Sequence, residues 1–153
     1  MRFLIQRVEK ASVHAEGELL GEIGKGFMVL IGVCDGDTVQ IADKMLKKMM
    51  GLRIFADQEG KTNLSLDQVG GGLLLVSQFT LYADCRKGYR PSFTRSGPAQ
   101  TAEELFHYIV DRAKANMPGV QSGSFGAHMK VSLVNDGPFT VLLDSDELFS
   151  GQL

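Results

Sequence analysis

The chain has 153 residues, of which 44% are hydrophobic and 22% are charged. This length and composition are typical of one globular domain and exclude a disordered polypeptide. Lysine and arginine total 16 against 18 acidic residues, for a net charge of −2, which argues against a protein that coats nucleic acid by bulk charge and leaves room for a local basic patch.

Apolar patterns predict six strands, with glycines marking turns between several of them. The segment 73–76 is apolar on both faces, so we expect it to be a central strand. The predicted strands cover residues 3–8, 18–23, 27–33, 73–79, 129–135 and 140–144.

Two helices are expected between these groups of strands. The first covers residues 38–50, where apolar residues share one stripe and lysines lie off it. The second begins at Thr101, which the pattern predicts to cap the helix while Glu104 bonds back to it. This order of elements predicts a single α+β domain, residues 1–153, in which both helices cover one face of a mainly antiparallel sheet or open barrel.

The segment 83–97 is long, polar and poor in aliphatic residues. Long loops in compact domains are often functional, and basic residues interleaved with aromatics such as Tyr89 and Phe93 suit phosphate contacts and base stacking. From these residues alone, a solvated loop with scattered charge is an equally good interpretation. The basic residues are Arg86, Lys87, Arg90 and Arg95.

Common catalytic patterns are absent from the sequence. The three histidines lack the paired spacing of a metal site, the two cysteines are far apart, and neither a phosphate-binding glycine loop nor a nucleophile elbow is present. We therefore predict no metal and no cofactor. A small-ester hydrolase built on Cys85 and His107 stays open as an alternative, because catalytic groups assemble in space. No apolar run is long enough to span a bilayer and the N-terminus has no signal-peptide core, so we expect a cytoplasmic protein.

Two polar segments are the best candidates for chemistry. Ser77, Gln78, Phe79 and Thr80 end the buried strand, where backbone amides can stabilise an oxyanion. Taken alone, these residues favour ordinary hydrogen bonding at a strand end. The segment 135–140 contains Asn-Asp-Gly-Pro, and taken alone it favours a hairpin turn between two strands.

Five motifs, these two included, make the chain resemble the D-aminoacyl-tRNA deacylases (also called D-tyrosyl-tRNA deacylases) over essentially its whole length. They begin with Met-Arg-x-x-Ile-Gln-Arg-Val and end with Asn-Asp-Gly-Pro, in the order and at the spacings of the family. The motifs occupy residues 1–8, 77–81, 87–93, 123–129 and 135–138.

The resemblance implies a homodimer of compact, barrel-like subunits with two active sites at the subunit interface. It implies hydrolysis of the ester between a D-amino acid and the terminal adenosine of tRNA, which releases the amino acid and keeps D-residues out of translation. It further implies that tRNA is the nucleic-acid partner, with neither DNA nor a membrane involved.

The resemblance also implies roles for the two central motifs. Residues 77–80 form the catalytic segment, in which either Thr80 is the nucleophile or backbone amides hold the ester carbonyl while the ribose 2′-OH helps to activate water. We favour the second route, because the sequence places no base beside Thr80. The carbonyls of Gly137 and Pro138, joined by a cis bond in the family, are expected to exclude L side chains. Glycine then passes, including glycine mischarged on the alanine tRNA.

The remaining expected roles concern substrate binding. Arg7 is expected to steady the partner's Gly–Pro segment near the substrate. A non-catalytic module that binds aminoacyl-tRNA and cleaves neither enantiomer is the alternative reading. The terminal adenosine is expected to contact Ala102, Phe125 and Met129, and the tRNA phosphates to contact Arg86, Lys87 and Arg90.

Overall fold

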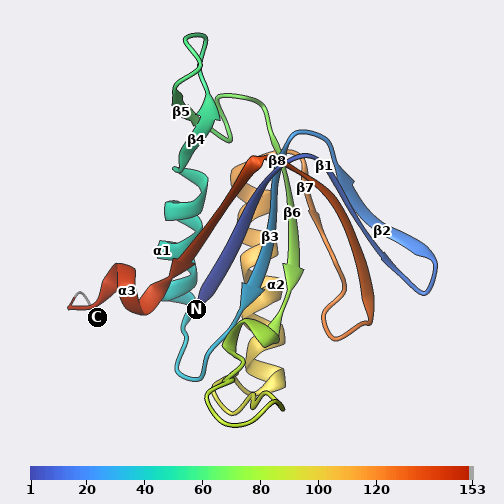
Figure 1. The fold of residues 1–153 in the computed structure, drawn as a ribbon, viewed down its shortest axis with the longest axis vertical. Coiled ribbons are helices and arrows are strands. Elements are labelled where there is room, and N and C mark those ends of the chain that lie inside the picture. Colours follow the sequence, from blue (N-terminus) through green and yellow to red (C-terminus); the bar gives the residue numbers. More distant parts are fainter. Residues whose placement is uncertain (152–153) are drawn as a thin grey trace.

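A computed structural model describes residues 1–151 of the chain (Figure 1). The first half contains β1 (Arg2–Ala15), β2 (Glu18–Ile23), β3 (Gly26–Gly32), α1 (Val39–Met50), β4 (Arg53–Ala56), β5 (Thr62–Ser65) and β6 (Gly72–Ser77). The second half contains the 3-10 helix η1 (Phe79–Tyr82), α2 (Ala99–Asn116), β7 (Val120–Ser122), β8 (Met129–Asp144) and α3 (Ser145–Phe149).

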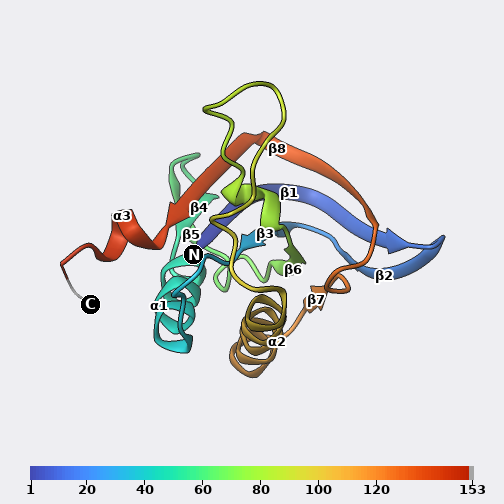
Figure 2. The same cartoon turned by 90° about the horizontal axis from the view of Figure 1, so that it is seen from below.

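The main sheet has the order β2-β1-β3-β6-β7, and β8 pairs with β1 outside this path. The pairs that β1 makes with β2, β3 and β8 are antiparallel, whereas β6 is parallel to both β3 and β7. Figure 2 shows β1 and β8 as long curved strands that bend the sheet towards a barrel. The predicted α+β class and barrel-like sheet are confirmed, and the sheet is mixed.

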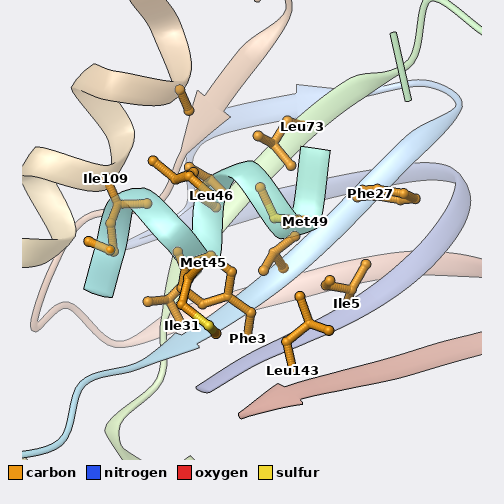
Figure 3. Packing of buried hydrophobic residues seen from close by; sticks show 14 of the residues in the cluster. Phe3, Ile5, Phe27, Ile31, Met45, Leu46, Met49, Leu73, Ile109 and Leu143 are labelled. Carbon is orange, nitrogen blue, oxygen red and sulfur yellow. The ribbon is translucent and has the colours of Figure 1, made fainter. Parts of the chain in front are cut away.

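The two faces of the sheet bury two apolar clusters, because side chains alternate along each strand. Leu73 and Leu75 of β6 lie in the larger cluster with residues of α1 and α2, and Leu74 and Val76 lie in the smaller one. Figure 3 shows how residues of α1, Met45 among them, pack on the strands. Both helices therefore cover one face, and β6 is a buried central strand, as predicted.

The start of α1 was predicted correctly and the start of α2 was not. Thr38 caps α1, with its Oγ1 accepting a hydrogen bond of 3.3 Å from the Ile41 N–H. The α2 helix begins two residues before Thr101, at Ala99, and its N-cap is Pro98, which makes no side-chain capping bond. The capping-box pattern was misleading because Ala99 and Gln100 are good helix formers and extend the helix up to a proline.

The hairpin turn that the residues alone favoured within 135–140 is wrong. β8 runs from Met129 to Asp144 as one strand and pairs along nearly its whole length with β1, which is itself longer than the predicted 3–8. Sequence patterns also missed the β4–β5 hairpin, β7 and α3. No helix within residues 1–151 is long and apolar enough to cross a membrane.

Candidate functional site

A cavity of about 550 Å³ opens where β6 ends, between the start of α2 and the segment that leads into β8. Six of the predicted site residues line it: Ser77, Gln78, Phe79, Ala102, Phe125 and Met129. Residues from loops complete the wall, and among them Ser96 and His128 had no predicted role. Most of the lining is apolar, with a few polar groups at the end of β6, which is the usual composition of a small-molecule site.

The segment that follows β6 at this cavity carries backbone amides without backbone partners. The Gln78 N–H donates a hydrogen bond of 2.7 Å to the Ile31 carbonyl, so this amide is occupied by the sheet. Phe79 and Thr80 begin η1, and among residues 1–151 their amides make no backbone hydrogen bond, as expected for the first turn of a helix. The donors available to an oxyanion are thus the amide of Phe79, which lines the cavity, and that of the next residue, Thr80.

Contacts with distant parts of the chain hold η1 in place. Arg2 donates a hydrogen bond of 2.8 Å to the Leu81 carbonyl and is paired with Asp144 at 2.7 Å. The guanidinium of Arg2 also lies 4.6 Å from the ring centroid of Tyr82, which is buried. Burial raises the pKa of the Tyr82 hydroxyl above its usual range, so this side chain stays neutral.

Thr80 itself is exposed and is not among the residues that line the cavity. Its Oγ1 accepts a hydrogen bond from the Gln78 side-chain amide. Among residues 1–151 neither a histidine nor a carboxylate is hydrogen-bonded to this hydroxyl. A hydroxyl needs such a base to become a strong nucleophile, so one chain does not supply an activated Thr80.

The Gly137–Pro138 segment is a bulge in the middle of β8. Gln6 pairs with Thr140 and Val8 with Asn135, so four residues of β8 lie opposite Arg7 alone. The Gly137–Pro138 peptide bond is cis, and Gly137 has a φ of +129°, a conformation that side chains rarely adopt. Both residues are exposed at this bulge.

The Asn135 side chain closes this bulge, and sequence reasoning gave it no role. Its Nδ2 donates to the carbonyls of Arg7 and Phe139, each at 3.0 Å, and its Oδ1 accepts a bond of 3.1 Å from the Phe139 N–H. The side chain therefore replaces the strand pairing that the extra residues interrupt. The position of Asn135 in the Asn-Asp-Gly-Pro motif was the signal that could have indicated this role.

Arg7 holds the same bulge from the other side. It donates hydrogen bonds of 3.1 Å to the Asp136 carbonyl and 2.6 Å to the Ile54 carbonyl of β4, and its guanidinium lies 4.7 Å from the Phe139 ring centroid. The structure thus places Arg7 against the Gly–Pro segment of its own chain. Neither Arg7 nor Gly137 lines the cavity of that chain.

The predicted phosphate-binding residues lie on a loop that projects from the body of the molecule (Figure 2). Asp84 and Ser92 bridge the two arms of this loop with backbone hydrogen bonds of 2.7 and 2.9 Å. Arg86 donates hydrogen bonds to the Asp84 carboxylate and lowers its pKa to about 2. Lys87 and Arg90 are exposed at the tip.

The structure also bears on the alternative hydrolase built on Cys85 and His107, and on possible metal ligands. Cys85 is exposed on the same loop, and among residues 1–151 it has no hydrogen bond to His107. The described part of the chain holds no group of three or more histidine, cysteine or acidic side chains that could bind a metal ion. The described residues thus present a backbone amide at an apolar cavity, a second amide next to it and a basic loop that follows in the chain, an arrangement suited to a ligand with a carbonyl group and phosphates.

Comparisons with known proteins give the family. The family model described as D-Tyr-tRNA(Tyr) deacylase matches residues 4–144. The D-aminoacyl-tRNA deacylase of Clostridium acetobutylicum is 48% identical over 149 residues, which are 97% of this chain and 100% of that protein. The D-aminoacyl-tRNA deacylase of Stenotrophomonas maltophilia (strain K279a) is 54% identical over 144 residues, with 94% and 99% covered. The chain belongs to the D-Tyr-tRNA(Tyr) deacylase family.

Solved structures agree with this fold. The c-Myc DNA Unwinding Element Binding Protein superposes with a TM-score of 0.89 at 35% identity, over 94% of this chain and 98% of that one. A structure described as a probable eukaryotic D-amino acid tRNA deacylase has a TM-score of 0.77 at 17% identity over 93% and 97%, and shows the fold alone. The chain is thus an ester hydrolase that acts on D-aminoacyl-tRNA, its substrate partner, and serves tRNA proofreading.

Proposed function

We propose that the cavity at the end of β6 binds the terminal adenosine of tRNA and that the amides of Phe79 and Thr80 hold the ester carbonyl. The observation that carries this proposal is a pair of consecutive amides without backbone partners, that of Phe79 in the wall of a largely apolar cavity and that of Thr80 next to it. Phe125 and Met129 offer apolar contacts for the adenine, and Ala102 leaves room for it at the start of α2.

In this proposal water attacks the ester carbonyl carbon and the bond to the ribose 3′-oxygen breaks. The adjacent 2′-OH takes a proton from the water as it gives its own proton to the 3′-oxygen, which leaves as a hydroxyl. The two amides stabilise the negative charge that develops on the carbonyl oxygen. Thr80 then contributes its backbone N–H rather than its hydroxyl, in agreement with the absence of a bonded base.

Selectivity for the D-enantiomer is proposed to come from Gly137 and Pro138 of a second copy of the chain. Their segment is exposed and firmly anchored by Asn135 and Arg7, and it does not line the cavity of its own chain. The carbonyls of this segment would occupy the space that an L side chain needs, so selectivity is exclusion of the L form. Glycine has no side chain to exclude, so glycyl-tRNA, including that mischarged on the alanine tRNA, is a proposed substrate.

A homodimer is required for this arrangement. β8 is an edge strand paired only with β1 within the described residues, and its Val134 and Leu142 side chains are 40% and 52% exposed. An uncovered edge strand with apolar side chains favours contact with another chain. The dimer would bring the Gly137–Pro138 segment of each copy to the cavity of the other.

The tRNA phosphates are proposed to contact Arg86, Lys87 and Arg90 on the projecting loop. The whole chain carries a charge of −2, so attraction to RNA must come from this local cluster. Affinity for tRNA is therefore expected to fall steeply as salt rises, with a slope of log K against log[salt] that becomes shallower by about one for each contact removed. Titrations of Lys87→Gln and Arg90→Gln variants at several salt concentrations measure this slope.

The basic loop alone would equally suit a non-catalytic module that binds aminoacyl-tRNA, and membership of the deacylase family argues for the enzyme instead. The name of one structural neighbour refers to DNA binding, and that property concerns the neighbour. We propose no DNA partner for this chain, because its expected chemistry needs a ribose with a 2′-OH. We place its work in the cytoplasm, where aminoacyl-tRNA is made.

The decisive experiment follows ester loss from D-tyrosyl-tRNA and from L-tyrosyl-tRNA in the presence of a chelator. We expect rapid hydrolysis of the D form alone. Hydrolysis of both forms would keep the enzyme and remove the exclusion mechanism. Survival of both esters would favour the binding module, and loss of activity that returns with added metal would remove the metal-free mechanism.

A further inference from the structure

All three exposed aromatic side chains of residues 1–151 lie on one segment, between the end of β6 and the start of α2. Phe79 is 56% exposed, Phe93 is 37% exposed and Tyr89 is fully exposed. Single exposed apolar side chains are common on protein surfaces, whereas a group of aromatics on one segment indicates a binding surface. The other large exposed hydrophobic side chains are aliphatic and lie elsewhere: Leu19, Leu20, Val39, Val134 and Leu142.

Phe79 and Phe93 form a fixed pair. Their ring centroids are 5.0 Å apart and the rings meet at 68°, an edge-to-face contact. Ser96 fixes both backbones, because its Oγ donates to the Phe79 carbonyl at 3.1 Å and its N–H donates to the Phe93 carbonyl at 3.0 Å. A surface ordered in advance loses less entropy when a ligand binds.

This aromatic pair connects the cavity to the basic loop. Phe79 and Ser96 belong to the cavity wall. Phe93 directly follows Ser92, whose backbone bridge to Asp84 closes the base of the loop that carries Arg86, Lys87 and Arg90. A strand that leaves the cavity over Phe93 therefore meets cationic side chains next.

We propose that the Phe79–Phe93 pair is a stacking platform for the unpaired nucleotide that precedes the terminal adenosine of tRNA. Flat aromatic side chains beside cations match the bases and phosphates of a single strand, because every base has a face that stacks. Basic residues outnumber acidic ones on the segment 79–97, where Asp84 is the sole acidic residue, and this favours a polyanion over a protein partner. The proposal deepens the deacylase function and depends on the terminal adenosine occupying the cavity.

The proposal predicts that the enzyme distinguishes a dinucleotide ester from a nucleoside ester. Two probes test this: 3′-O-(D-tyrosyl)adenosine, and the same ester on cytidylyl-adenosine. We expect kcat/KM of the wild-type chain to be about 10-fold higher for the dinucleotide ester, the effect of stacking one base. The ratio of the two kcat/KM values cancels any change that affects the cavity in both reactions.

Three variants make the test specific. Phe93→Leu keeps an apolar side chain without a flat face and should bring the ratio close to one, whereas Phe93→Trp should preserve or raise it. Leu19→Ala removes an apolar side chain from β2 that is 48% exposed, more than Phe93, and should leave the ratio at the wild-type value.

The outcomes separate this proposal from the proposed function. A wild-type ratio near one, or a Phe93→Leu ratio equal to that of the wild type, overturns the stacking platform while D-ester hydrolysis still supports the deacylase. If Phe93→Leu lowers kcat/KM for both esters equally, Phe93 only supports the cavity, and the platform is likewise overturned. If the wild type hydrolyses neither ester nor D-tyrosyl-tRNA, the proposed function itself fails.

Discussion

The end of β6 and the middle of β8 both carry motifs of this family, but different parts of the chain build them. At the end of β6 the groups offered to a substrate are backbone amides, which the sheet and η1 orient. In the middle of β8 the backbone leaves its pairing with β1, and side chains of Asn135 and Arg7 hold it. The first region should therefore tolerate side-chain changes that the second does not.

The same difference separates the two proposed tasks. Hydrolysis must work on many D-amino acids, so it benefits from groups that contact only the shared ester atoms. Exclusion of the L form depends on where a surface lies to within about half an ångström, so it requires an anchored segment. Breaking each region should thus affect a different quantity, the rate with the D-ester or the ratio of D to L hydrolysis.

The largest effect is expected from a change in the substrate that binds at the end of β6. Replacing the 2′-OH of the terminal adenosine by hydrogen should lower the hydrolysis rate of D-tyrosyl-tRNA by about 10²- to 10⁴-fold, because it removes the proposed proton acceptor. Single-turnover rates at saturating enzyme measure this change. The matched control is a 2′-deoxy substitution at the preceding nucleotide, and equal rates for the two substrates would contradict the role of the 2′-OH.

The next largest effect is expected at Gly137. Replacing it by alanine would put a Cβ 2.9 Å from an Arg7 side-chain nitrogen in a backbone conformation with φ of +129°. The bulge must then shift, and we expect the ratio of D to L hydrolysis to fall by at least about 10-fold, since a loss of about 1.4 kcal/mol in discrimination has that effect.

The control for Gly137→Ala is Gly60→Ala in the β4–β5 hairpin. Gly60 also has a positive φ, of +76°, but a Cβ there meets nothing within 4 Å. Gly60→Ala should lower the free energy of unfolding and leave the D to L ratio unchanged. If the two variants change the ratio equally, general destabilisation and not the bulge accounts for it.

A smaller effect is expected at Asn135. Asn135→Asp keeps the shape of the side chain but removes the donor that serves the Arg7 and Phe139 carbonyls. We expect a loss of about 1–3 kcal/mol in the free energy of unfolding, the cost of leaving such groups unpaired. The D to L ratio should fall with it. Asn116→Asp, which removes an exposed side-chain bond to the Arg112 carbonyl, is the control and should keep the ratio.

The fold was predictable where the final environment of a segment is reflected in its own residues. The run 73–76 is apolar on both faces because β6 lies between two strands and two apolar clusters. The segment 135–138 was misread because Asn-Asp-Gly-Pro favours a turn by itself, whereas the path of β8 is decided by pairing with β1 on both sides of the bulge. Pairing between strands at opposite ends of the chain leaves no periodic signal at the bulge.

The residues of the candidate site were predictable where they belong to sequence motifs. Residues 77–79, Phe125 and Met129 belong to motifs, and the structure brings them to one cavity. Ser96 contributes through bonds to the Phe79 and Phe93 carbonyls, and such bonds depend on how the loop folds back. The sequence also gave no sign that the Gln78 amide is already hydrogen-bonded, because its acceptor lies on the neighbouring strand β3.

The smallest effect is expected at the Thr80 hydroxyl. Thr80→Ala removes the acceptor of the Gln78 side chain but keeps the backbone N–H, so kcat/KM should fall by about 5-fold or less, the effect of one hydrogen bond. Thr80→Pro removes the N–H and also disfavours the helical conformation of Phe79, whose amide is the other proposed donor, so it should lower kcat by about 10²-fold or more. Both variants lack the hydroxyl, so the difference between them measures the backbone donors of Phe79 and Thr80. A loss with Thr80→Ala as large as that with Thr80→Pro would make the hydroxyl the nucleophile, and a base from the second chain would then be required beside it.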